Sequence, residues 1–198
     1  MGKQFSVLLT IFCLFLIGCN KKEEETIPKL VETTKNNQPF ECSVGTTYTE
    51  KEDEEGTALE CFCLDENNQK TGLFYVYYLD TKTLWVLGEY KNDKTVGKWA
   101  LWDKEKNLRM LGYYNDNSQP DGLGVFYLED GDYKVIYVDN GEPPNEILVF
   151  ESNGNLKEII LRDAGVIIPR IQIEELALEI EKKVKEDLAK ALKDLPTP

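Results

Sequence analysis

The 198-residue chain contains no histidine. Without histidine there is no Ser-His-Asp triad and no Cys-His pair, the common arrangements that activate a serine or cysteine nucleophile. The imidazole ligand that many zinc sites use is missing as well. Paired carboxylates can hydrolyse glycosides, but no pair stands out among the 36 acidic residues. The composition therefore predicts a protein that is not an enzyme and that uses no metal or cofactor.

Basic residues are scarce relative to acidic ones. Lysine and arginine together number 23, which leaves a formal net charge of −13 at pH 7. Nucleic-acid phosphates require basic patches, so this balance argues against a nucleic-acid partner. The same charge would repel anionic lipid headgroups. Basic or neutral partners remain open.

Long hydrophobic runs are missing except at the N-terminus. There, Lys3 is followed by FSVLLTIFCLFLIG, which is too short for a confident membrane span. The run ends in LIGC, where a glycine directly precedes Cys19. This pattern resembles the lipobox of bacterial lipoproteins, which implies cleavage before Cys19 and acylation of its thiol and new amino group. We therefore expect residues 1–18 to be a signal peptide and lipid on Cys19 to anchor the protein to a membrane.

Residues 19–39 are polar and show no sustained hydrophobic period, so we expect a flexible tether. The tether begins CNKKEEET, and its lysines and glutamates resemble the surface-export tag of Bacteroidetes lipoproteins. An ordinary solvated charge run explains them equally well. Asn20 replaces the aspartate that retains enterobacterial lipoproteins in the inner membrane, which favours the outer membrane. Either a periplasmic or a surface-exposed orientation fits.

Three cysteines remain after Cys19: Cys42, Cys61 and Cys63. An exported protein meets oxidising conditions, so Cys42 can pair with either of the other two and staple the first two strands. Cys61 and Cys63 would share one face of a strand without easily bonding each other. Alternatively, all three are small buried apolar residues. Three thiols lack a fourth ligand, so no metal site is predicted.

A repeated pattern organises the middle of the chain. Four units start 25, 25 and 23 residues apart, and each carries an aromatic residue five positions after its start. The starts are Gly72, Gly97, Gly122 and Asn145, and the aromatic residues are Tyr77, Trp102, Tyr127 and Phe150. Each unit continues with a polar turn and a second apolar stretch, which is typical of a β-hairpin.

We therefore expect a mainly β domain over residues 40–161. About ten strands should form one twisted antiparallel meander of stacked hairpins. The glycine that opens each unit should serve the turn with a positive φ. The segments GEYKNDKTVGKWALW (88–102) and GYYNDNSQPDGLGVFY (112–127) resemble the MORN-like repeats of the YwqK antitoxin-type family. That resemblance covers roughly residues 57–161; its antitoxin label implies a cytoplasmic partner that a lipidated chain would not meet.

Residues 162–198 are expected to be a linker and a C-terminal helix. Glutamates crowd the start of 173–195 and lysines its end, as the helix dipole prefers. One apolar stripe recurs at steps of three and four: Ala177, Ile180, Val184, Leu188, Ala191 and Leu195. We expect this amphipathic helix to cover an apolar face of the sheet, although it could also bind a partner helix.

The aromatic residues supply the candidate ligand-binding positions. Tyr77, Trp102 and Tyr127 should lie in register on one face, where such rings stack on sugars or grip a peptide. Packing under the terminal helix is the favoured alternative, because these rings belong to the repeat signature. Tyr113 and Tyr114 are better placed for exposed contacts. The acidic turns offer oxygens to calcium, but turn chemistry alone selects the same residues.

Two functions fit these observations. The first is a non-catalytic lipoprotein of the bacterial outer membrane that binds a protein or a glycan. The alternative is a periplasm-facing immunity or accessory protein that neutralises a toxin or supports an envelope assembly.

Overall fold

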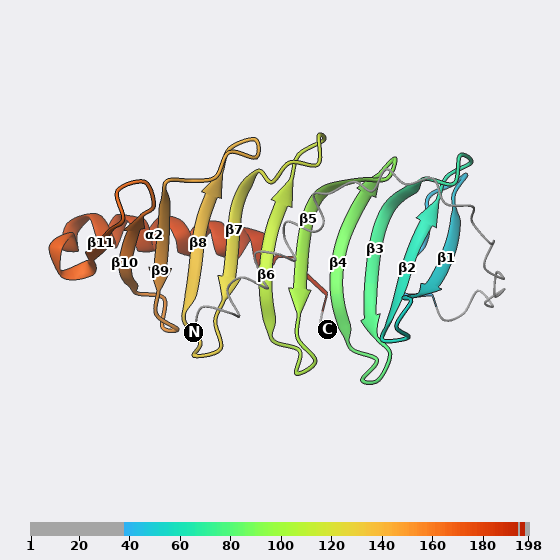
Figure 1. Ribbon diagram of the computed structural model, residues 1–198, viewed down its shortest axis with the longest axis horizontal. Coiled ribbons are helices and arrows are strands. Elements are labelled where there is room, and N and C mark those ends of the chain that lie inside the picture. The colour runs from blue at the N-terminus through green and yellow to red at the C-terminus, as the bar shows by residue number, and fades with distance from the viewer. Residues whose placement is uncertain (1–37, 194, 197–198) are drawn as a thin grey trace. The chain divides into compact units, whose positions relative to one another are not determined.

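The computed structural model describes residues 38–193 and 195–196. The predicted signal peptide, Cys19 and nearly all of the predicted tether lie outside these residues. The described part forms one 11-stranded sheet in which every strand pairs with its neighbours in sequence, antiparallel throughout (Figure 1). The prediction of a mainly β antiparallel meander is confirmed, with eleven strands instead of about ten.

The strands are short and follow one another at close intervals. They are β1 (Thr47–Glu52), β2 (Ala58–Leu64), β3 (Lys70–Tyr78), β4 (Leu84–Lys91), β5 (Lys94–Trp102), β6 (Leu108–Tyr114), β7 (Gly122–Tyr127), β8 (Tyr133–Val138), β9 (Glu146–Phe150), β10 (Leu156–Leu161) and β11 (Val166–Pro169). A 3₁₀ turn, η1 (Arg170–Gln172), leads into the helix α2 (Glu174–Leu192).

The eleventh strand lies in the segment predicted as a linker. Val166–Pro169 pairs with Glu158–Leu161 of β10 after a turn in which Gly165 has a φ of 63°. A run of four residues is too short to show an alternating pattern, so the sequence offered no clear strand signal here.

Polar five-residue loops close several of the hairpins in one way. In the loop Asp103–Asn107, the N–H of Asp103 donates to the carbonyl of Asn107, and the N–H of Lys106 donates to the carbonyl of Asp103, both at 3.0 Å. Lys106 has a φ of 70°. The same two bonds close the loops 65–69, 115–119, 128–132 and 151–155. Asp, Asn and Gly recur in these loops because they tolerate the left-handed backbone and satisfy the turn's N–H groups.

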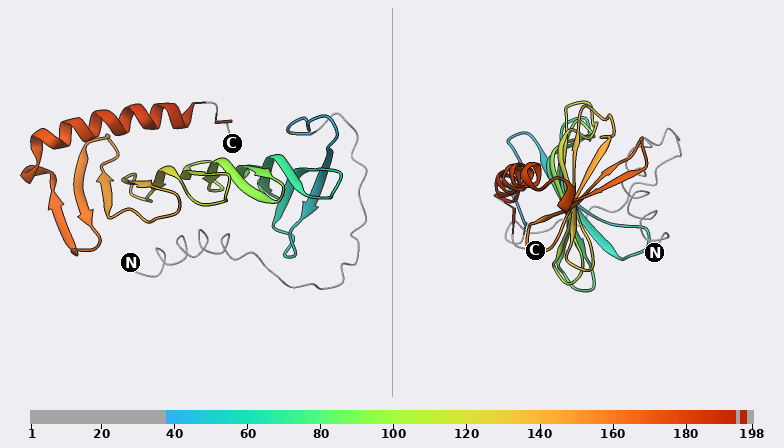
Figure 2. Two further views of the ribbon diagram at one scale, coloured as in Figure 1. Left: turned by 90° about the horizontal axis from the view of Figure 1, so that it is seen from above. Right: turned by 90° about the vertical axis from the view of Figure 1, so that its left-hand side faces the viewer.

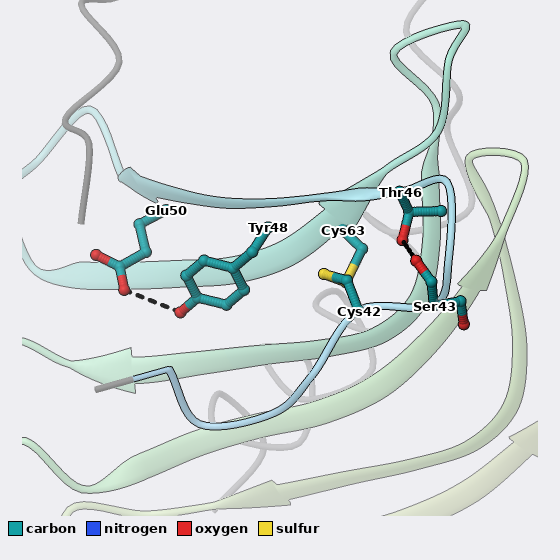
Figure 3. The surroundings of a disulfide bond; sticks show 6 residues. All are labelled: Cys42, Ser43, Thr46, Tyr48, Glu50 and Cys63. Atoms are coloured by element: carbon teal, nitrogen blue, oxygen red, sulfur yellow. Dashed lines mark hydrogen bonds between the residues drawn. A yellow bond between two sulfur atoms is a disulfide. The ribbon is translucent and has the colours of Figure 1, made fainter. Parts of the chain in front are cut away.

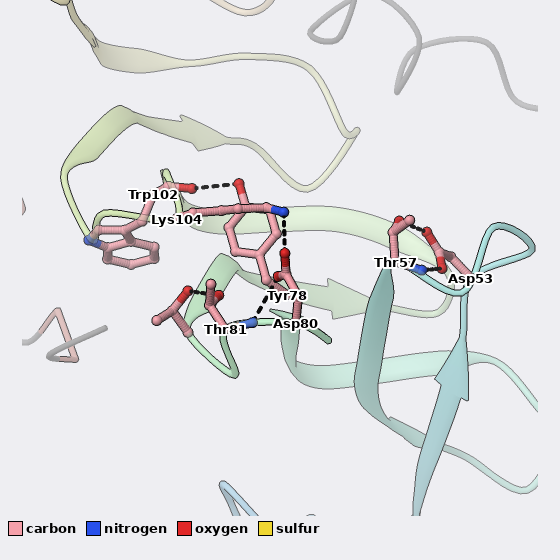
Figure 4. A network of polar contacts seen from close by, with 8 residues as sticks. Asp53, Thr57, Tyr78, Asp80, Thr81, Trp102 and Lys104 are labelled. Atoms are coloured by element: carbon pink, nitrogen blue, oxygen red, sulfur yellow. Dashed lines mark hydrogen bonds and ion pairs between the residues drawn. The ribbon is translucent and has the colours of Figure 1, made fainter.

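Successive loops on one side of the sheet also contact each other (Figure 4). Lys104 Nζ lies 2.6 Å from Asp80 Oδ2, and the hydroxyl of Tyr78 donates to the carbonyl of Trp102 at 3.2 Å. Each pair is separated by 24 residues, about one repeat. The contacts therefore tie each unit to the next, as in other stacked repeats.

The glycines that open the repeats have the predicted positive φ but a different role. Gly72, Gly97 and Gly122 have φ values of 75°, 66° and 89°. Gly72 and Gly97 lie inside strands, where the register shifts, and Gly122 is the first residue of β7, so none lies within a turn. The turn before Gly97 is made instead by Asn92 and Asp93, with φ values of 54° and 62°. Gly72 and Gly97 thus lie at bulges, which bend and twist the sheet.

One face of the sheet and the inner side of α2 form the main hydrophobic core. The buried sheet residues of this core are Leu84, Leu87, Ala100, Trp102, Leu111, Leu123, Val125, Tyr133, Val135, Leu148, Phe150, Leu156 and Ile159. Helix α2 runs along this face (Figure 2). Its buried residues are Ala177, Val184 and Ala191, and the remaining stripe residues pack against the same core. The prediction that the helix covers the sheet is confirmed.

Polar contacts hold the helix in place at its middle and its end. Glu181 Oε1 accepts hydrogen bonds from the N–H of Leu156 at 2.9 Å and from Arg170 Nε at 3.0 Å. Burial by itself would raise the pKa of Glu181, but these bonds outweigh it and lower the pKa. Lys98 Nζ donates to the carbonyl of Lys193 at 2.9 Å, beyond the last helical turn.

Gly88 and Gly112 occupy corresponding places in successive repeats and allow a matched test. A Cβ at Gly88 would lie 2.5 Å from the ring of Trp99, whereas a Cβ at Gly112 would meet no atom within 4 Å. We expect Gly88→Ala to lower the free energy of unfolding by about 1–3 kcal/mol through overpacking. Gly112→Ala should change it by less than about 0.5 kcal/mol. Urea unfolding followed by tryptophan fluorescence measures both, and equal effects would contradict the packing of Trp99 on Gly88.

Glu181→Gln tests the helix anchor and its pH dependence. At pH 7 we expect the free energy of unfolding to fall by about 1 kcal/mol, because the charged hydrogen bond from Arg170 is removed. The pKa of Glu181 is lowered from 4.5, so its contribution is complete above that pH and disappears as the pH falls through the lower folded value. The difference in free energy of unfolding between the wild type and Glu181→Gln should therefore become smaller at acidic pH. The exposed Glu179→Gln is the control, and a difference independent of pH would contradict the anchor.

Candidate binding site

The predicted aromatic residues Tyr77, Trp102 and Tyr127 all contribute to the main hydrophobic core. Trp102 is only 4% exposed, and Tyr77 and Tyr127 are half-buried against the same cluster. Phe150, the fourth aromatic residue of this set, is fully buried and stacks on Tyr133 with 5.1 Å between ring centroids. Packing therefore accounts for these rings, and little of Trp102 is within reach of a ligand.

Tyr113 and Tyr114 lie on opposite faces of the sheet. They are adjacent in β6, and successive side chains of a strand point to opposite sides. Tyr114 contacts Trp99 edge-on, with 6.0 Å between ring centroids. Tyr113 lies on the helix-covered face and packs against the main core. Of the five predicted ligand-binding residues, Tyr113 is the one that lines an open hollow.

The hollow has a volume of about 270 Å³ and lies where the second half of α2 meets β6, β7 and β8. Its floor is a row of residues across the three strands. Leu123 is paired directly with Tyr137, and Tyr113 lies on the neighbouring strand β6, where its carbonyl accepts from the N–H of Asp121 at 2.9 Å. A leucine thus lies between two longer tyrosines, which leaves space above it.

A small residue of the helix keeps this space open. Gly122 also lines the hollow, with its backbone. On the helix side, the facing residue is Ala191, whose methyl group is too short to fill the gap. The hollow therefore results from the small side chain of Ala191 facing the two tyrosines.

Charged residues of α2 form the wall of the hollow. The hydroxyl of Tyr137 donates to Asp187 Oδ2 at 2.7 Å, and Lys183 Nζ lies 2.7 Å from the same oxygen. Lys183 Nζ also lies 3.9 Å from the centroid of the Tyr137 ring. Hydrogen bonds from Lys183 and Tyr137 lower the pKa of Asp187, which keeps it ionised at neutral pH. Lys190, one helical turn further, completes the wall.

A second group of aromatic residues lies on the opposite face, and a lysine of the protein itself lies over their rings. Lys70 Nζ lies 4.5 Å, 4.7 Å and 5.4 Å from the ring centroids of Phe62, Phe74 and Tyr90. The same ammonium pairs with Glu60 at 3.0 Å. Because an internal cation already occupies these rings, they serve to hold the strands together.

The acidic turns use their oxygens within the chain. Asp65 Oδ1 accepts from the N–H groups of Asn67 and Gln69 at 2.8 and 2.9 Å. Asn115 Oδ1 accepts in the same way from Asn117 and Gln119. Within residues 38–193, no cluster of three or more metal-ligating side chains is found. Turn formation explains these residues without a bound cation.

The structure chooses among the disulfides that the sequence left open. Cys42 and Cys63 are bonded, while Cys61 is a buried free thiol (Figure 3). The bond does not join the first two strands as predicted, since Cys42 precedes β1. A turn lies between Cys42 and β1, and in it the N–H of Thr46 donates to the carbonyl of Ser43. Burial raises the pKa of the Cys61 thiol, which makes it unreactive.

Three residues of the hollow were missed by the sequence analysis: Tyr137, Asp187 and Lys190. Tyr137 lies outside the 25-residue pattern of aromatic residues, and the two charged residues look like the ordinary polar side of an amphipathic helix. A scan against protein-family models found no match for this chain, and a search of curated proteins found none either. Function therefore has to be inferred from the chemistry of the hollow and from the N-terminal sequence.

Cys42→Ala tests the disulfide. Its 21-residue separation predicts a loss of about 3 kcal/mol in the free energy of unfolding, since the unfolded chain is no longer constrained. A reductant should destabilise the wild-type protein by a similar amount and leave the variant unchanged. Thiol labelling of the native wild-type protein should be slow, because its free thiol is buried. A reductant effect of the same size in both proteins would argue against the Cys42–Cys63 bond.

Proposed function

We propose that the protein is a lipid-anchored binding module of the bacterial outer membrane, which holds a protein or glycan ligand in the hollow between α2 and β6–β8. The observation that supports this proposal best is the hollow itself. Two tyrosines and the charged residues Asp187 and Lys190 converge on it. Apolar rings with a few placed polar groups are the usual composition of a ligand site.

The walls of the hollow belong to regular structure on all sides. Tyr113, Leu123 and Tyr137 lie on central strands of the sheet, and Asp187 is fixed by two hydrogen bonds. Side chains held in this way lose little further freedom when a ligand binds. The arrangement suits recognition, since a preformed site needs no rearrangement before it binds.

The chemistry of the hollow fits binding better than catalysis. Asp187 accepts from both Tyr137 and Lys183, and its lowered pKa keeps it an acceptor at neutral pH instead of a proton donor. Burial raises the pKa of Tyr113 and Tyr137, so neither phenol is available as a base. The net charge of −13 favours basic or neutral ligands.

Membrane attachment rests on the sequence around Cys19. In the part of the chain that the structure describes, no helix is both long and apolar enough to span a membrane. The LIGC motif supports attachment through acyl chains on Cys19, and the following KKEEE segment supports export to the cell surface.

Cys19→Ala tests the anchor. We expect the variant to leave the membrane fraction, because acyl chains provide the attachment. Protease treatment of intact cells, followed by immunoblotting for the β domain, then tests orientation in the wild type. Loss of the domain from unbroken cells supports surface display. Survival until the outer membrane is opened would overturn surface display and favour a periplasmic accessory role, and membrane retention of Cys19→Ala would overturn the lipid anchor.

Tyr113→Ala tests the binding site. Full-length wild-type protein is applied to a glycan array and used in pull-downs from envelope extracts, and each retained ligand is then tested with the variant. We expect the affinity to fall at least about tenfold, or ~1.4 kcal/mol, because a central aromatic contact is lost. Tyr78→Ala, a tyrosine stacked on Trp85 and outside the hollow, is the control. Equal losses in both variants, or no loss at Tyr113, would contradict this site.

A further inference from the structure

We infer that the hollow accepts one uncharged sugar ring, as a single residue of a neutral glycan. This inference rests on the proposed function and specifies its ligand. Four properties of the hollow support it: its size, the spacing of its tyrosines, the charges on its helical wall and its place in the middle of the sheet.

The size of the hollow selects a ligand of about one ring. The hollow has a volume of about 270 Å³ and is open to solvent on one side. Sites for larger organic ligands usually enclose about 300–1,000 Å³. A single six-membered sugar ring with its hydroxyl groups matches the smaller volume, whereas a ligand of several fused rings would extend outside it.

The tyrosines are spaced to flank a flat ring. Tyr113 and Tyr137 lie on β6 and β8, with Leu123 of β7 between them. Two strand spacings separate their backbones by roughly 9.5 Å, which leaves a slot above Leu123. Aromatic faces carry negative charge density and attract the weakly positive C–H groups on the face of a sugar.

The helical wall offers one acceptor, Asp187, and one donor, Lys190, to a ligand. Asp187 and Lys190 are three residues apart, so they lie side by side on α2. Asp187 uses Oδ2 for its bonds to Tyr137 and Lys183. Its Oδ1 and the ammonium of Lys190 can then meet two neighbouring hydroxyl groups. The net charge of −13 of the whole chain disfavours an anionic sugar.

The position of the hollow argues against an extended peptide. Peptides commonly bind a sheet by adding a strand to its edge, where backbone groups are unpaired. Strands β6, β7 and β8 are central, and each pairs with neighbours on both sides. The sheet's edges are β1 and β11, several strands away. A ligand in the hollow therefore finds no free sheet edge to pair with, which suits a sugar ring better than a peptide backbone.

The test is saturation-transfer difference NMR on the full-length protein, with defined small probes. These are methyl glycosides of neutral hexoses and of N-acetylhexosamines, methyl glucuronide as an anionic probe, and an N-acetylated tripeptide amide. We expect transfer to the ring C–H protons of a neutral glycoside and at least tenfold weaker binding by Tyr113→Leu and Lys190→Met. Lys190 is exposed, so its variant should fold normally, and Lys185→Met on another side of α2 is the control.

The outcomes separate this inference from the proposed function. Binding of the glucuronide as tightly as of the neutral glycosides would overturn it, and so would binding of the tripeptide alone. Tyr113-dependent retention of another partner, with no transfer to any glycoside, would also overturn it while leaving the proposed function intact. If no retained ligand depends on Tyr113, the proposed function is wrong, and the inference that rests on it is wrong as well.

Discussion

The covering of one apolar face by α2 is the contact on which the rest of the structure depends. A single sheet has no second sheet to pack against, and the described strands form one sheet only. Residues such as Leu111, Val125 and Phe150 are fully buried because the helix lies along the face that carries them. Burying one large apolar side chain contributes about 1.5–3 kcal/mol, compared with about 1 kcal/mol for a typical hydrogen bond, so the many buried side chains together outweigh the polar contacts between helix and sheet. Glu181, Tyr137 and Lys98 then fix the position of the helix.

The repeat determines which side chains lie on the face that α2 covers. Each unit places a large aromatic side chain at the same point of the hairpin, and the bulges at Gly72 and Gly97 bend and twist the sheet. Contacts between loops one repeat apart keep the units aligned. The result is a rigid frame, and the hollow forms where the frame and the helix leave a gap. Its tyrosines, Tyr113 and Tyr137, lie outside the repeated aromatic positions, which are used for packing.

This division of the aromatic residues suggests how a repeat architecture acquires a binding site. Positions that every repeat needs for packing, such as Trp102 and Phe150, are not available to a ligand. Tyr113 and Tyr137 lie instead on the second strands of successive units, and Ala191 of the helix leaves space between them. The proposed function therefore depends on a few residues outside the repeated aromatic positions.

The sequence by itself determined the hairpins, their period, the positive φ of the repeat glycines and the apolar stripe of the helix, because these depend on local backbone preferences and periodicity. It also placed Tyr113 among the candidates. Only the tertiary structure decided that Cys42 pairs with Cys63, that a run of four residues forms β11, and that Asp187 meets Tyr137, which is 50 residues away. The rotation and position of a helix on a sheet follow from the packing of many side chains at once. No local pattern in the chain records that packing.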